Sequence, residues 1–123
     1  MANELVISTL TINFDKSGSP SIEAVPAALS ITVSGAQLMD NVQNIGTSEE
    51  AILLGDVATG GYWFVQNLDS TNFVELRSGT GATDFIRLNA GEWAIFRTSS
   101  DATAPYAIAD SSACNVRFLR FDA

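Results

Sequence analysis

The chain has 123 residues, of which 46% are hydrophobic and only 16% are charged, and this length suits one domain with one core. Its net charge of −8 argues against nucleic-acid binding, because phosphate contacts need clustered lysine and arginine side chains. The sequence contains no histidine, which excludes catalytic sites of the Ser-His-Asp and Cys-His types and metal sites built on histidine.

The first third of the chain has the pattern of short strands joined by turns. Residues 5–14 begin apolar and then alternate, which predicts a strand, and the turn-forming residues of 15–20 end it. A short extended piece is predicted for 22–25, and alternating aliphatic and hydroxyl side chains predict a strand over 28–34. Residues 1–5 carry no basic region and no long apolar run, so we expect neither a signal peptide nor a membrane span.

The next two segments leave alternatives open. Residues 37–45 are interpreted as strand or irregular structure, although three aliphatic side chains at helical spacing also allow a helical turn. Residues 49–54 are interpreted as a short extended piece bounded by glycines. The competing interpretation is one helical turn that starts at Thr47 or Ser48 and has the glutamates in its first turn.

The most regular stretch holds three segments rich in aromatic and β-branched residues, at 62–68, 73–77 and 92–98. Each segment stops at Asn, Asp, Ser or Gly residues, which favour turns because they bond their own backbone or tolerate positive φ. We therefore predict an antiparallel meander of these three strands. Residues 79–81 lack the Lys-Ser/Thr pair of a phosphate-binding loop and are interpreted as a loop tip.

The last two strands are predicted at 105–109 and 114–121. Alternation along the final strand places Arg117 and Arg120 on opposite faces, so both faces must be partly covered. Cys114 is the only cysteine and cannot form a disulfide within the chain, and its apolar neighbours predict a small buried side chain.

About nine short strands with turn signals between them, and no convincing helix, predict an all-β fold. We expect an antiparallel β-sandwich of jelly-roll type that forms a single domain over residues 1–123. An open barrel is the alternative architecture.

The carboxylates give little indication of catalysis. Glu75, Asp84 and Glu92 lie near one another in the sequence, as a glycosidase pair would, but so small a chain has little room for a deep cleft. Loop residues that could supply oxygen ligands to calcium are Asp69, Ser70, Asn72 and Asp84. They follow no ordered ligand pattern and are better interpreted as solvated turn residues. We expect no enzymatic activity, no catalytic or metal-binding residue and no cofactor.

A partner interface is the more informative hypothesis. The low charge indicates apolar surface that meets a partner, although Ser, Thr, Asn and Gln side chains could also replace the missing charges. All five arginines lie in the second half, where they could meet an acidic partner or pair with acids across strands. Tyr62, Trp63 and Trp93 could form a platform for a sugar. Because Val65 and Ile95 follow the tryptophans at a spacing of two, we expect inward faces in the core or at a subunit interface. The interface candidates are Tyr62, Trp63, Trp93, Arg97, Arg117 and Arg120.

Three stretches resemble small virion structural proteins of tailed bacteriophages: GYWFVQNLDSTNFVEL at 61–76, LNAGEWAIFR at 88–97 and ADSSACNV at 109–116. The resemblance covers most of the second half of the chain. It implies a non-enzymatic β-domain, such as the trimeric cement or decoration proteins that stabilise assembled capsids. On this basis we expect a homotrimer that is made in the host cytoplasm and binds the major capsid protein on the virion. A receptor- or carbohydrate-binding tail module and a tail or neck connector are the alternatives.

Overall fold

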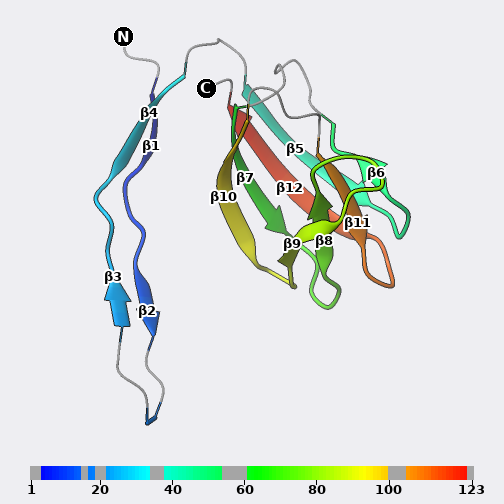
Figure 1. The fold of residues 1–123 in the computed structure, drawn as a ribbon, viewed down its shortest axis with the longest axis horizontal. Coiled ribbons are helices and arrows are strands. Elements are labelled where there is room, and N and C mark those ends of the chain that lie inside the picture. The colour runs from blue at the N-terminus through cyan, green and yellow to red at the C-terminus, as the bar shows by residue number, and fades with distance from the viewer. Residues whose placement is uncertain are drawn as a thin grey trace. The chain divides into compact units, whose positions relative to one another are not determined.

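The structure is a computed structural model that describes residues 4–14, 17–18, 22–33, 38–53, 61–99 and 105–121. The chain forms two compact units, Met1–Ser34 and Gly35–Ala123 (Figure 1). Twelve strands and no helix occur among the described residues, which confirms the all-β prediction. Consequently, the described part of the chain contains no helix long and apolar enough to cross a membrane.

The first unit is an antiparallel two-stranded ribbon. β1 (Glu4–Ile7) pairs with β4 (Leu29–Thr32), and β2 (Ile12–Phe14) pairs with β3 (Ile22–Ala24). The predicted turn at 15–20 is described only at residues 17–18, where Gly18 adopts a φ of 82° that favours glycine. The strand predicted over 5–14 is therefore two shorter strands, β1 and β2.

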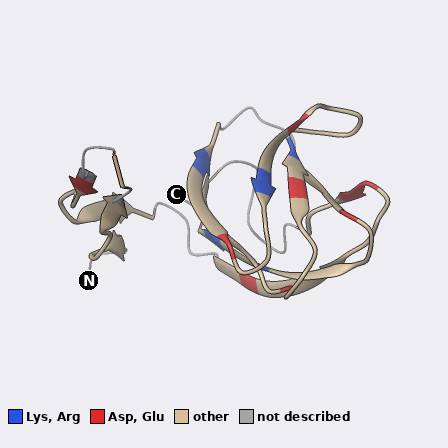
Figure 2. Ribbon diagram, turned by 90° about the horizontal axis from the view of Figure 1, so that it is seen from below, with Lys and Arg blue, Asp and Glu red and all other residues tan. Residues whose placement is uncertain are grey.

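The second unit is a sandwich of two four-stranded antiparallel sheets, shown from two sides in Figures 1 and 2. Sheet 1 has the strand order β10-β7-β12-β5 and sheet 2 the order β6-β11-β8-β9. The strands of sheet 1 are β5 (Leu38–Ile45), β7 (Gly61–Asn67), β10 (Trp93–Thr98) and β12 (Cys114–Phe121). Those of sheet 2 are β6 (Glu50–Ala51), β8 (Val74–Arg77), β9 (Asp84–Leu88) and β11 (Tyr106–Ala109).

The topology of the sandwich is that of a jelly roll. In sheet 1 the last strand, β12, lies between β5 and β7, and in sheet 2 β11 lies between β6 and β8. Eight strands that interleave in this way across two sheets are characteristic of jelly rolls. The predicted jelly-roll sandwich is confirmed, in place of the open barrel. The sandwich is formed by the second unit, so a single domain that includes residues 1–34 stays a prediction.

The predicted meander is wrong, because the consecutive strands β7 and β8 belong to opposite sheets. β7 pairs with β10 and β12, whereas β8 pairs with β9 and β11. The sequence pattern missed β9, whose alternation is interrupted at Phe85. The register passes from Leu76 opposite Ile86 to Arg77 opposite Asp84, which leaves Phe85 as the extra residue of a β-bulge.

The two ambiguous segments before the central stretch are both extended. Residues 38–45 form the strand β5 along their whole length, so the helical alternative is excluded there. Glu50 and Ala51 form the short strand β6, and Thr47 and Ser48 lie in a bend rather than at the start of a helix. Leu54, the last residue of the second segment, lies outside the described residues.

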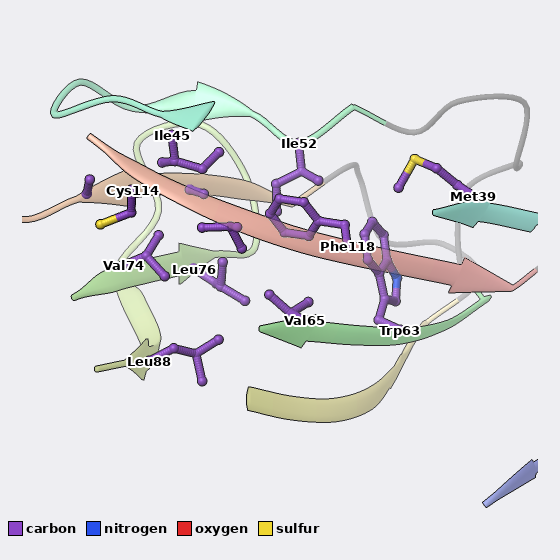
Figure 3. Packing of buried hydrophobic residues seen from close by; sticks show 13 residues of the cluster. Met39, Ile45, Ile52, Trp63, Val65, Val74, Leu76, Leu88, Cys114 and Phe118 are labelled. Atoms are coloured by element: carbon purple, nitrogen blue, oxygen red, sulfur yellow. The ribbon is translucent and has the colours of Figure 1, made fainter. Parts of the chain in front are cut away.

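The core fills the space between the two sheets, as Figure 3 shows. Inward positions alternate along each strand, so β7 contributes Trp63 and Val65 while β12 contributes Val116 and Phe118. Cys114 is fully buried, as predicted. Burial raises the pKa of its thiol, and the negative charges of acidic neighbours raise it further.

A buried amide holds the end of the core together. The side chain of Asn67 donates from Nδ2 to the carbonyl oxygens of Asn72 at 2.9 Å and Leu88 at 3.0 Å. These bonds fix the predicted turn after Asn67 and join it to sheet 2, since Leu88 ends β9. The second predicted turn, at 88–92, is also present, and Gly91 supplies its positive φ of 79°.

Candidate interface on the outer face of sheet 1

The side of sheet 1 that points away from the core carries mainly apolar and aromatic side chains. Because β7 turns Trp63 and Val65 inward, Tyr62 and Phe64 point outward. The same alternation operates in the other three strands. We call the following outward residues the outer face: Leu38, Asp40, Val42, Tyr62, Phe64, Gln66, Trp93, Ile95, Arg97, Arg117, Leu119 and Phe121.

The strand register arranges the outer face in three rows across the sheet. In the order β10, β7, β12, β5, the rows are Arg97, Tyr62, Phe121 and Leu38; Ile95, Phe64, Leu119 and Asp40; and Trp93, Gln66, Arg117 and Val42. Directly opposed residues lie about 5 Å apart at Cβ, so neighbours in a row touch. The rows therefore form one continuous surface, in which the ring centroids of Phe64 and Trp93 lie 5.9 Å apart.

The rim of the outer face is strongly exposed. Leu38 is 63% exposed, Val42 52% and Trp93 48%. Phe64 and Leu119, in the middle row, are partly covered by their neighbours. Single exposed apolar residues are ordinary in soluble proteins, but a continuous apolar surface marks a site of interaction.

The charged residues of the outer face form contacts with other residues of the same face. Arg117 donates two hydrogen bonds to Asp40, Nε to Oδ1 at 3.1 Å and Nη2 to Oδ2 at 3.0 Å. These hydrogen bonds, with the attraction between the charges, lower the pKa of Asp40 and raise that of Arg117. The Arg97 guanidinium lies over the Tyr62 ring, 5.3 Å from its centroid. Both arginines therefore lie along the face, and its apolar side chains are contiguous in the first two rows, while Gln66 and Arg117 occupy the middle of the third.

Four of the six predicted interface residues meet on the outer face: Tyr62, Trp93, Arg97 and Arg117. The other two, Trp63 and Arg120, point into the sandwich and are each 1% exposed. The Arg120 guanidinium lies 4.7 Å from the Trp63 ring centroid, so these two residues pack on each other within the protein. The four outward residues can therefore contact a partner directly, and this contact stays a prediction.

The apolar residues at the centre of this surface, among them Phe64, Ile95 and Leu119, are not among the six predicted interface residues. The inward direction expected for Trp93 and Ile95 is wrong, because β10 turns Ala94 and Phe96 toward the core. One feature of the sequence could have indicated a second apolar face. In β7, β10 and β12, both the odd-numbered and the even-numbered residues include apolar side chains. In such strands period-two alternation cannot decide which set is buried.

The carboxylates considered for catalysis form structural contacts. Asp84 forms an ion pair with Arg77, and Glu75 lies 3.6 Å from Arg87. Glu92 accepts a hydrogen bond from the Asn89 backbone N–H at 2.7 Å. Within the described residues, no group of three or more acidic or cysteine side chains could hold a metal ion.

Glu49 anchors the loop between β8 and β9. Its carboxylate pairs with Arg77 and accepts hydrogen bonds from the Thr80 hydroxyl at 2.6 Å and the Gly81 N–H at 2.9 Å. The Thr80 bond is the largest cause that lowers the pKa of Glu49, followed by the Gly81 and Arg77 bonds. Thr80 and Gly81 therefore form a loop tip, as predicted, that is tied to the segment before β6.

Acidification should destabilise the fold through Glu49. Its pKa is lowered on folding, so its contribution is fully present above the ordinary carboxyl pKa of 4.5 and is lost as pH falls through the lower folded value. We expect the urea midpoint of Glu49→Gln to fall less than that of the wild type between pH 6 and pH 3. Glu23→Gln, a change at an exposed ribbon residue, is the control. Parallel pH profiles for wild type and Glu49→Gln would contradict this role.

A cavity of about 280 Å³ lies between the two sheets, beside β8, β9 and β10. Leu76, Ile86, Phe96 and Pro105 give it a mainly apolar lining. Arg77 also lines it, but its guanidinium is paired with Glu49 and Asp84 and is therefore not available as a lone charge. The volume is slightly below the range of roughly 300–1,000 Å³ that is usual for ligand pockets.

The sequence matches no protein-family model, no curated protein and no solved structure. A functional proposal for this chain therefore depends on the physical character of its own surfaces. Among the surfaces that the structure describes, the outer face is the one whose composition is best explained by a partner.

Proposed function

We propose that this chain is a cement, or decoration, protein of a tailed bacteriophage, which binds the assembled capsid surface as a homotrimer and stabilises it. The observation that carries the proposal is the outer face, a mainly apolar surface that extends across the four strands of sheet 1 and is of the kind that a partner covers. The partners are other copies of the chain and the major capsid protein. The protein is made in the host cytoplasm and acts on the capsid surface of the virion.

The mechanism is burial of surface rather than chemistry, with no catalytic residue and no cofactor. A protein that binds only the assembled capsid lowers the free energy of that state by mass action. Separation of capsid subunits must then also break the contacts of each bridging copy. An apolar face suits this role because burial of apolar area is the main favourable term in most protein association.

Two further observations support the proposal. Jelly-roll sandwiches are a frequent architecture of viral capsid domains, although this fold also serves lectins and enzymes and so does not imply a function by itself. The stretch that resembles phage virion proteins, 61–76, includes β7, and β7 supplies Tyr62 and Phe64 to the outer face.

The test compares phage particles with and without this protein. We expect particles that lack it to release their DNA at a lower temperature, and purified protein added back to restore the wild-type temperature. Measurement of DNA release by dye fluorescence during heating gives the comparison directly. Equal heat tolerance with and without the protein would reject the cement role.

A carbohydrate- or receptor-binding tail module is the second candidate. The observation in its favour is that the Trp93 ring, 48% exposed, lies beside Phe64 on the outer face, where a pyranose could stack. A glycan array decides between the two candidates: glycan binding that Trp93→Ala abolishes favours the tail module. A tail or neck connector is distinguished from a cement protein by its much lower copy number per virion.

A further inference from the structure

The cavity between the two sheets has an apolar wall built by both of them. Leu76 of β8, Ile86 of β9 and Phe96 of β10 belong to the core or pack against it, and all three line the cavity together with Pro105, just before β11. Phe85 also lines the cavity and is 67% exposed, so the cavity reaches the surface beside the edge strand β9. A small molecule can therefore enter it without separating the sheets.

The size of the cavity is unusual for a natural core, because protein interiors are close-packed and contain few spaces larger than a water molecule. Water is a poor occupant here, since a buried water needs roughly two to four polar partners and the lining is mainly apolar. In another protein, an apolar cavity of about 150 Å³ binds benzene. A cavity of about 280 Å³ therefore has room for an apolar molecule about twice the size of benzene.

The two charged side chains of the described lining both have partners within the protein. The Arg77 guanidinium forms ion pairs with Glu49 and Asp84. The Arg97 guanidinium lies over the Tyr62 ring, which is on the outer face of sheet 1 rather than between the sheets. A charged ligand would lose its hydration in the cavity without gaining an unpaired counter-charge, so the ligand should be neutral.

The hydroxyl groups of the described lining also have partners within the protein. The Thr98 hydroxyl accepts a hydrogen bond from Nε1–H of Trp63 at 3.1 Å and donates one to the Gly61 carbonyl oxygen at 3.3 Å. Ser78 and Ser99 each have an interaction partner as well. These groups therefore need no polar ligand to complete their hydrogen bonding, and the apolar wall decides what the cavity binds.

We propose that the cavity is a binding site for a small neutral aromatic molecule of about two fused rings. The lining favours an aromatic ligand because Phe85 and Phe96 contribute rings, and rings pair well with other rings in offset-stacked or edge-on arrangements. Binding removes apolar surface of the ligand and of the protein from water, and it stabilises the folded chain by mass action. The site lies between the sheets, so the inference is independent of the cement role proposed for the outer face.

Titration of the full-length protein with naphthalene, followed by NMR, tests this site. We expect nuclear Overhauser effects between naphthalene protons and the methyl groups of Leu76 and Ile86, and a dissociation constant of about 0.1 mM or lower. The charged analogue naphthalene-2-sulfonate should bind at least about tenfold more weakly, because its sulfonate loses hydration on entry. Absence of these Overhauser effects at the highest soluble naphthalene concentration, or effects only at outer-face residues such as Leu119, would overturn the inference.

A matched pair of variants gives a second measurement. Ile86→Phe places a larger side chain in the cavity and should weaken naphthalene binding at least about tenfold. Ile108→Phe makes the same change on the outward side of β11 and should bind naphthalene as the wild type does. Equal binding by the wild type and a folded Ile86→Phe protein would overturn the inference. If the Ile86→Phe protein is unfolded, the Overhauser effects in the wild type decide the result.

Discussion

Replacement of Trp63 by alanine is expected to lower the free energy of unfolding by about 3–5 kcal/mol, the cost of a large aromatic side chain lost from a core. The Trp63 ring stacks on Phe96 and meets Phe118 edge-on, with centroid separations of 6.2 and 6.4 Å. Its Nε1–H donates to the Thr98 hydroxyl at 3.1 Å, and the Arg120 guanidinium covers the ring. Urea unfolding followed by circular dichroism measures the loss.

The expected loss of stability is large because the Trp63 side chain makes contacts with several other buried residues. Trp63 connects β7 to β10 through Phe96 and to β12 through Phe118, so its removal leaves a void between three strands of sheet 1. The buried Arg120 also loses the ring on which it lies, and a buried charge that loses favourable contacts adds to the cost. Because small domains have a total stability of about 5–15 kcal/mol, the variant should be partly unfolded at 37 °C.

The other tryptophan is the natural control. Trp93 lies at the rim of the outer face and is 48% exposed, so Trp93→Ala should cost about 1 kcal/mol or less. Equal losses, measured at a protein concentration low enough to keep the chain monomeric, would show that Trp63 is not in the core, or that Trp93 is covered within a single copy. Either result would contradict the assignment of inner and outer faces.

The sequence pattern was sufficient for the fold class because most of its signals were local. The turns at Asn67 and Gly91, the final strand and the burial of Cys114 all follow from short-range chemistry, namely amides that bond their own backbone, positive φ and alternation. Sheet membership is not local. The connection from β7 to β8 crosses between sheets, and its residues are the same turn formers that a hairpin would use.

The candidate site was predictable in part for a related reason. Tyr62, Trp93, Arg97 and Arg117 were identified as interface candidates and share the outer face, but Trp63 and Arg120 lie on the opposite side of the same sheet. Period-two alternation separates the two sets in each strand, yet it does not say which set faces the core when both are apolar. Three-dimensional packing decides it: the set of β7 that contains Trp63 faces sheet 2 and is buried.

Introduction of a carboxylate at the centre of the outer face should abolish association. Phe64 lies in the middle row between the apolar side chains of Ile95 and Leu119. The nearest cations, Arg97 and Arg117, lie diagonal to it in the outer rows and are already engaged, by the Tyr62 ring and by Asp40. Burial of an unpaired charge costs several kcal/mol, so Phe64→Asp should weaken association by at least about 100-fold. Sedimentation velocity of the full chain should show the wild type as a trimer and Phe64→Asp as a monomer.

The matched control is Phe85→Asp, which makes the same chemical change on sheet 2 at a position that is already 67% exposed. It should remain trimeric, and Phe64→Leu, which keeps the face apolar, should restore most of the association. Thermal unfolding of each variant shows whether Phe64→Asp is still folded, which its partly exposed position permits. A folded Phe64→Asp protein that associates as tightly as the wild type would show that the outer face is not an interface, since no partner could cover that carboxylate without the cost of its desolvation.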